Sequence, residues 1–195
     1  LFDTHAHYDD EQFDTDRREV LSSLPDHNVS LVLNPASNID SARKIMSYLD
    51  EFPFLYAAVG THPHDAARMT DDDLSEFEKM SEHPKVVAIG EIGLDYYYDN
   101  SPRPEQKKRL RDQLALALHH QRVALHHAEP ADAERAHEHA VREEVAGDVV
   151  VEGAEDRRLL AVDEPARQHH VVARVADQVL GDGERVGHHL QPAGG

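Results

Sequence analysis

Short apolar runs alternate with amphipathic segments along the first 118 residues. The apolar runs predict strands at about 1–7, 29–36, 54–60 and 85–90. The amphipathic segments predict helices at about 14–24, 38–52, 71–83 and 103–118. Asn38 is a typical N-cap residue for the second helix, and three Asp residues at the start of the third suit the helix dipole.

This alternation of strands and helices predicts the fold class α/β, with a parallel sheet. Four strand–helix units amount to about half of a (β/α)8 barrel of roughly 250 residues. We therefore expect a TIM-type (β/α)8 barrel that is incomplete or distorted after residue 118. In such a barrel the active site lies where the strands end.

The composition of the chain changes near residue 109. From Arg109 to Gly195 only ten amino acids occur, all encoded by codons that begin with G or C: Ala, Arg, Asp, Gln, Glu, Gly, His, Leu, Pro and Val. In ordinary proteins these ten amino acids make up only about half to two-thirds of the residues, so their exclusive use from Arg109 to Gly195 is not a chance result. A GC-rich gene read out of frame, or from the wrong strand, beyond about residue 118 is the favoured hypothesis; a genuine His- and Ala-rich low-complexity region is the alternative.

We accordingly interpret residues 1–195 as one domain, with residues 1–118 as the first half of the barrel and 119–195 as an aberrant tail. Ten of the 16 His residues lie from Arg109 onward, so their number is a poor indication of metal binding.

Charge and composition narrow the possible functions. Cysteine is absent, which excludes disulfides and thiolate metal sites. With 38 acidic and 20 basic side chains the net charge is −18, so broad electrostatic binding to nucleic acid is not expected and a polyanionic substrate would need bound metal. We find no apolar run long enough to span a bilayer and no leader pattern after Leu1, and we predict a cytoplasmic protein without a membrane or obligate protein partner.

The segment "FDTHAHYDD" places two imidazoles, His5 and His7, two residues apart. On a strand they point to the same face and can share one cation. Imidazole suits zinc, manganese, iron or cobalt, and nearby carboxylates such as Asp3, Asp9 and Asp10 shift the preference toward harder ions. Two His residues with only local hydrogen bonds are the alternative.

Glu91 is the carboxylate delivered by the apolar strand of "VVAIGEIGLDYYYD", between Gly90 and Gly93. A carboxylate at a buried strand end is costly unless it is paired or binds metal, which favours a functional role over an ion pair.

The motif "GTHPH" brings His62 and His64 to the end of the third strand, where they could contact a substrate phosphate or only cap a turn. The three tyrosines at 96–98 could stack on a base, or form a packed aromatic loop. Because the carboxyl ends of parallel strands meet at one edge, we expect these residues to converge there: His5, His7, His62, His64, Glu91 and Asp95.

Several of these motifs occur together in one known family. The segments "FDTHAHYD", "VGTHPHDA" and "AIGEIGLDYYYD", followed by "SPRPEQKKRLRDQLALA", resemble successive signatures of the TatD family of metal-dependent deoxyribonucleases, which are amidohydrolase-like barrels. The resemblance extends from residue 1 to about 118. It implies a hydrolase that cleaves phosphodiester bonds of DNA, as an exonuclease, through a dinuclear site of Mg, Mn or Zn ions.

The resemblance also implies roles for individual residues. His5 and His7 would hold one ion, and Glu91 would bridge it to a second. The segment "RVALHH" is similar to the family's strand-five segment and makes His126 or His127 a further candidate ligand.

Three further residues complete the implied site. "LLAVDEPA" resembles the segment that carries a late metal-binding Asp, here Asp163, which together with Glu91 would be catalytic. His62 and His64 would lie on the substrate side. Asp163 is too close to Glu91 along the chain for a full barrel, and no match exists for one intervening family His.

Two other functions stay open. A related metal-dependent hydrolase could act on an ester such as aminoacyl-tRNA, because a metal centre alone does not choose between phosphorus and carbonyl centres. Alternatively, the chain could be an inactive truncated fragment.

Overall fold

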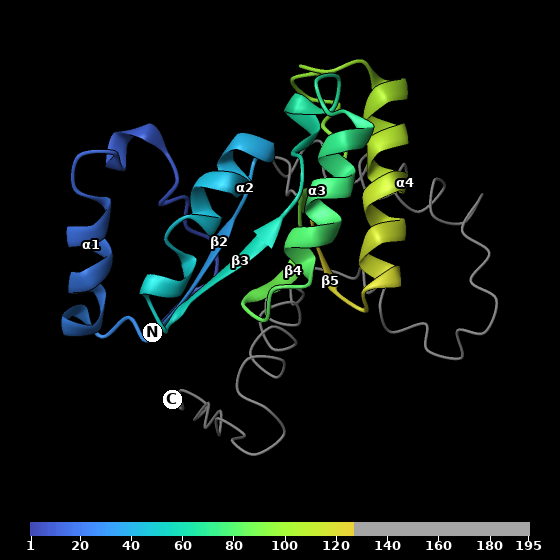
Figure 1. Ribbon diagram of the computed structural model, residues 1–195. Helices are drawn as coiled ribbons and strands as arrows, with labels where there is room; N and C mark the ends of the chain where they lie inside the picture. Colours follow the sequence, from blue (N-terminus) through green and yellow to red (C-terminus); the bar gives the residue numbers. More distant parts are fainter. Residues whose placement is uncertain (127–195) are drawn as a thin grey trace, which may run out of the picture.

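A computed structural model describes residues 1–126, in which five parallel strands form one sheet in the order of the chain (Figure 1). The strands are β1 (Phe2–Asp3), β2 (Leu31–Pro35), β3 (Leu55–Val59), β4 (Val86–Ile92) and β5 (Val123–His126). Each strand pairs with the next along the sequence, as in the first half of a (β/α)8 barrel. The predicted fold class is confirmed for this part of the chain.

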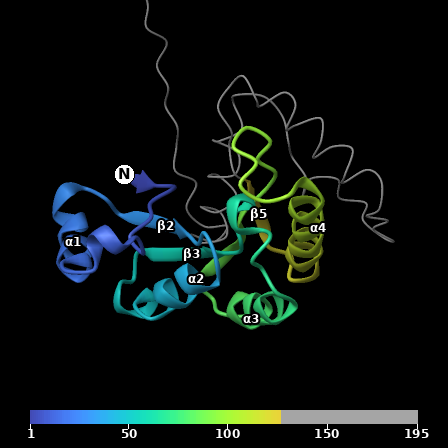
Figure 2. The same cartoon turned by 90° about the horizontal axis from the view of Figure 1, so that it is seen from above.

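Four α-helices connect the strands: α1 (Arg17–Ser23), α2 (Ile39–Met46), α3 (Asp71–Ser81) and α4 (Arg103–His119). Short 3-10 helices occur at η1 (Glu11–Phe13), η2 (Leu24–His27), η3 (Leu49–Glu51) and η4 (Pro63–Asp65). Seen from above, the four α-helices lie in an arc outside the strands (Figure 2). Because all five strands are parallel, their carboxyl ends lie at one edge of the sheet, and the predicted functional residues lie at that edge.

The two faces of the sheet have separate apolar clusters. The larger cluster joins alternate strand residues such as Leu55 and Val59 to the helices, where Leu110 and Phe77 are buried. The smaller cluster lies on the opposite face and contains the intervening residues Leu33, Ala58, Val87, Ala88 and Leu125. Both faces are apolar, which explains why the strands read as continuous hydrophobic runs rather than as alternating patterns.

Helix caps fix where two of the helices begin. The side chain of Asn38 accepts a hydrogen bond from the Ser41 N–H, as predicted. Thr70 and Asp73 form a reciprocal capping box at the start of α3. In the part of the chain that the structure describes, no helix has the length and apolar character needed to cross a membrane.

Three boundaries differ from the predictions. The first strand ends at Asp3 instead of residue 7, because the chain bends at His5. The predicted helix at 38–52 divides into α2 and η3, separated by a turn around Tyr48. Regular structure continues past residue 118 to the end of β5, and the rest of the predicted aberrant tail, from residue 127, lies outside the described residues.

Candidate metal centre

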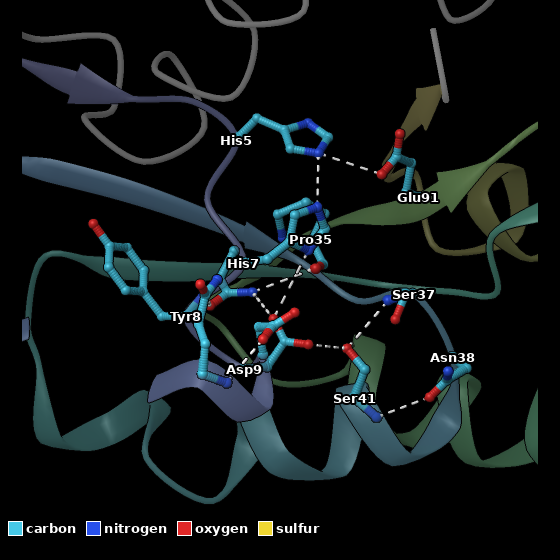
Figure 3. A network of polar contacts seen from close by, with 12 residues as sticks. His5, His7, Tyr8, Asp9, Pro35, Ser37, Asn38, Ser41 and Glu91 are labelled. Carbon is cyan, nitrogen blue, oxygen red and sulfur yellow. Dashed lines mark hydrogen bonds and ion pairs between the residues drawn. The ribbon is translucent and has the colours of Figure 1, made fainter. Parts of the chain in front are cut away.

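Two imidazoles and one carboxylate meet at the carboxyl edge of the sheet (Figure 3). The Nε2 atoms of His5 and His7 lie 3.1 Å apart, and His5 Nε2 lies 3.3 Å from an oxygen of Glu91. One donor atom from each of the three residues lies within 4.8 Å of the others. These three residues are among the five predicted metal ligands, and their imidazole and carboxylate groups are ligand types that suit zinc or manganese.

The local backbone explains how the two imidazoles come together although β1 ends before them. The N–H of Ala6, the residue between them, donates to the carbonyl of Leu33 at 3.1 Å, so this segment remains attached to the neighbouring strand. Both side chains are half-buried, with their rings 5.0 Å apart. The expected shared direction of His5 and His7 is thus present without a strand at these positions.

Glu91 lies within β4, one residue from its end, and only 8% of its side chain is exposed. The preceding residue, Gly90, allows β4 to approach β5 closely, since a Cβ atom there would lie 2.6 Å from the Cβ of Leu125. A hydrogen bond to Glu91 is the main cause that raises the pKa of His5, and it outweighs partial burial, which would lower it. The site therefore favours positive charge, which also suits a divalent cation.

Asp9 is a buried carboxylate beside His7 that sequence reasoning did not assign to the site. It accepts a hydrogen bond from the Asn34 amide at 2.7 Å. It also accepts one from the Ser41 hydroxyl at 2.6 Å (Figure 3). Its Oδ1 atom lies 3.9 Å from Nδ1 of His7, on the side of the ring opposite the Nε2 atom that faces His5. This distance is too long for a hydrogen bond, but it places negative charge on the Nδ1 side of the ring and leaves Nε2 facing His5.

A pocket of about 330 Å³ opens next to the three donor atoms. It is lined by His7, Asp9, Asp10, Ser37, His62, His64 and Glu91. This set includes both His residues of the "GTHPH" motif, so the expected convergence is present. Sequence reasoning missed Ser37, because its position depends on contacts distant in sequence, such as the His62 N–H that donates to its carbonyl, rather than on a local motif.

His62 and His64 hold each other in place at the pocket rim. Nδ1 of His62 accepts a hydrogen bond from the His64 N–H at 3.2 Å, and the two rings lie edge to face at 4.3 Å. The predicted turn-capping role of His62 is therefore present, and both side chains also face the pocket.

Asp95 is buried and pairs with Nε2 of His64. Burial alone would raise the pKa of the Asp95 carboxyl, but the N–H groups of Tyr98 and Tyr97 and the pairing with His64 outweigh it, so the pKa lies below its usual value. An ionised Asp95 thus links the His64 side of the pocket to the loop that follows β4.

The remaining predicted ligands come from the later part of the chain. His126 ends β5 and is in register with Ile92, so its backbone lies at the same edge as Glu91. His127 and Asp163 lie outside the described residues. Their roles, and that of the His126 side chain, stay predictions.

Known proteins that match this chain in sequence indicate its family. The family model described as "TatD related DNase" matches residues 2–153. The chain is 45% identical over 117 residues to the "Uncharacterized metal-dependent hydrolase YabD" of Bacillus subtilis, covering 60% of this chain and 46% of that protein. It is 32% identical over 118 residues to the "3'-5' ssDNA/RNA exonuclease TatD" of Musicola paradisiaca, covering 60% of this chain and 45% of that protein.

A solved structure has the same fold. The described architecture resembles YJJV, a TatD homologue from Escherichia coli K12, with a TM-score of 0.65 and 27% identity over 74% of this chain and 56% of that one. The chain spans about half the length of the curated relatives it matches.

Proposed function

The chain belongs to the family of TatD related DNases, and from this membership we propose that it carries the metal site of a hydrolase that cleaves phosphodiester bonds of DNA. The proposed reaction is the removal of nucleotides from an end of a DNA strand, and one relative is named as a single-stranded DNA and RNA exonuclease. The ions would be two, of magnesium, manganese or zinc.

The observation that carries this proposal is the convergence of His5, His7 and Glu91 beside a pocket. His5 and His7 follow β1 and Glu91 lies in β4, two strands that are separated by two others in the sheet, so imidazole nitrogens meet a buried carboxylate. The net charge of −18 makes a cation necessary for a polyanionic substrate, because the protein itself supplies no excess of positive charge.

Bound divalent ions would supply positive charge for the scissile phosphate and would lower the pKa of a water molecule that attacks it. His5 and His7 would donate Nε2 lone pairs, and Glu91 would bridge the two ions. His126 and Asp163 are proposed for the second ion, with Asp163 accepting the proton of the attacking water. His62 and His64 line the same pocket and would hold the phosphate next to these ligands.

The experiment is a hydrolysis assay of the full chain on single-stranded DNA labelled at one end or the other. We expect nucleotides to be released stepwise from one end in Mg²⁺ or Mn²⁺ and no release in EDTA. The double variant His5→Ala/His7→Ala should lose the metal-dependent release. Full metal-dependent release by that variant would contradict the proposal.

A second candidate is that this chain binds metal without turnover. Tight metal binding without hydrolysis of labelled DNA or of aminoacyl-tRNA would support it. Hydrolysis of the aminoacyl ester alone would support the related ester hydrolase instead.

A further inference from the structure

The loop after β4 displays two aromatic side chains to solvent. Tyr97 and Tyr98 are 60% and 61% exposed, and among the described residues only Leu1 is a further exposed large hydrophobic side chain. Their rings lie edge to face at 4.7 Å. Single exposed apolar side chains are common, but an adjacent exposed pair, one of which contacts the pocket-lining His64, is a candidate binding surface.

The backbone beneath these rings is anchored firmly. One carboxylate oxygen of Asp95 accepts the N–H groups of Tyr97 at 2.9 Å and Tyr98 at 3.0 Å. The Gln106 side chain accepts from the Asp95 N–H at 2.7 Å and donates to the carbonyls of Asp95 and Ser101 at 3.0 and 2.7 Å, which ties the loop to α4. Buried polar contacts therefore hold the backbone that carries the exposed rings, and little backbone ordering is required when a ligand binds.

The first tyrosine of the run has a different environment. Tyr96 packs against the main apolar core, and the Arg103 guanidinium lies 4.3 Å from the centre of its ring. Arg103 also pairs with Asp99 at 2.6 Å. Tyr96 is thus the packed member of the run, which leaves Tyr97 and Tyr98 for contacts outside the loop.

The exposed pair is continuous with the candidate metal centre. The ring of Tyr98 lies edge to face with His64 at 5.7 Å, and His64 lines the pocket together with His7 and Glu91. Asp95 binds both the His64 side chain and the Tyr97–Tyr98 backbone, so one buried carboxylate connects the pocket to the segment that carries the two rings.

We propose that Tyr97 and Tyr98 form a stacking platform for a nucleobase of a single-stranded substrate whose phosphate lies in the adjacent pocket. This inference rests on the proposed function. A planar nucleobase can stack on the exposed face of an aromatic ring, and stacking does not need an excess of positive charge, which this chain of net charge −18 does not have. A base is free to stack only where it is unpaired, so the platform selects single strands over duplexes.

The test measures binding separately from hydrolysis, by fluorescence anisotropy in Mg²⁺ of a labelled single-stranded oligonucleotide whose phosphorothioate linkages resist cleavage. The full chain is compared with Tyr97→Ala/Tyr98→Ala and with Tyr97→Phe/Tyr98→Phe, which keeps the rings. We expect the alanine variant to bind about tenfold more weakly or worse, because stacking on an aromatic ring contributes substantially for each base. The phenylalanine variant should bind like the unchanged chain.

A strand of the same length without bases supplies the matched probe, because it keeps every phosphate. The unchanged chain should bind it as weakly as the alanine variant binds the intact strand, and the alanine variant should not distinguish the two strands. Absence of binding by the unchanged chain, or equal affinity of the alanine and unchanged chains for the intact strand, would overturn the platform. If the platform fails in this way but the chain still hydrolyses single-stranded DNA, the proposed function stands without the platform. If binding depends on the bases but ordinary DNA is not hydrolysed in Mg²⁺, the platform stands and the proposed hydrolase function fails.

Discussion

Two groups of His and carboxylate side chains in the described residues bring their donor atoms within 4.8 Å, yet their surroundings differ. His5, His7 and Glu91 lie at the carboxyl ends of parallel strands beside a pocket. Glu78, His119 and His120 lie on α3 and at the end of α4, outside the sheet.

The environment of the carboxylate separates the two groups. Only 8% of the Glu91 side chain is exposed, whereas 51% of the Glu78 side chain is. Water can solvate the charge of the Glu78 carboxylate, so this residue does not need a cation. The buried Glu91 carboxylate needs a charged or hydrogen-bonding partner instead.

The second difference is the support behind the imidazoles. His7 has Asp9 behind it, and Asp9 is fixed by two hydrogen bonds to buried partners. In the other group, the buried Nε2 of His120 makes no hydrogen bond within the described structure and lies 3.7 Å from Glu78. We therefore expect the supporting contacts, and not the closeness of donor atoms alone, to decide which group binds an ion.

Exchange of the imidazoles for alanine in each group is the change with the largest expected effect. His5→Ala/His7→Ala should weaken Zn²⁺ or Mn²⁺ binding by more than about 100-fold, because removal of direct ligands costs more than removal of the residues that orient them. The matched variant His119→Ala/His120→Ala should leave the affinity measured by calorimetry unchanged. Equal losses of metal affinity in the two variants would contradict the claim that only the group at the strand ends binds the ion.

A smaller effect is expected when the support of His7 is removed. Asp9→Asn should weaken metal binding by about tenfold, since loss of an orienting carboxylate behind a ligand typically has this effect. The substitution keeps the size of the side chain, and Asp40→Asn, at an exposed position of α2, controls for the loss of one negative charge. An unchanged affinity in Asp9→Asn, with the fold intact by circular dichroism, would show that Asp9 acts only in folding.

The smallest expected effect concerns pH. The pKa of His5 is raised above 6.5, chiefly by its hydrogen bond to Glu91, and a metal ion must displace that proton. Metal affinity should therefore fall as the pH decreases through this raised pKa. In the metal-free chain the sign is opposite: the stability that protonated His5 contributes is fully present below its unfolded pKa of about 6.5 and is lost as the pH rises through the folded value.

NMR titration of His5 in the metal-free chain measures this pKa directly. Glu91→Gln should move it back toward 6.5, because the main cause of the shift is removed. A pKa that stays raised in this variant would assign the shift to another group.

The sequence predicted much of the fold because each strand forms a separate apolar run and the ends of two helices carry standard caps. Glu91 could be predicted as a site residue because a carboxylate at the end of such a run is unusual. Asp9 could not be predicted in the same way, since its partners Asn34 and Ser41 are 25 and 32 residues away and neither belongs to a local motif.

The length of the first strand was predicted wrongly for a related reason. The alternation of apolar and polar residues around "FDTHAH" is compatible with a strand, but only Phe2 and Asp3 pair in register with Leu31 and Val32. The exposed rings of Tyr97 and Tyr98 also depend on contacts distant in sequence, because Gln106 in α4 holds Asp95 beneath them.

The central claim is that the ends of the early strands, and not the helices outside them, form the metal site. Anomalous diffraction at the zinc edge from crystals of the full chain grown with Zn²⁺ tests it most directly. The claim predicts its strongest peak about 2.0–2.2 Å from Nε2 of His5, Nε2 of His7 and a carboxylate oxygen of Glu91. A strongest peak between Glu78, His119 and His120, with none at the strand ends, would contradict it.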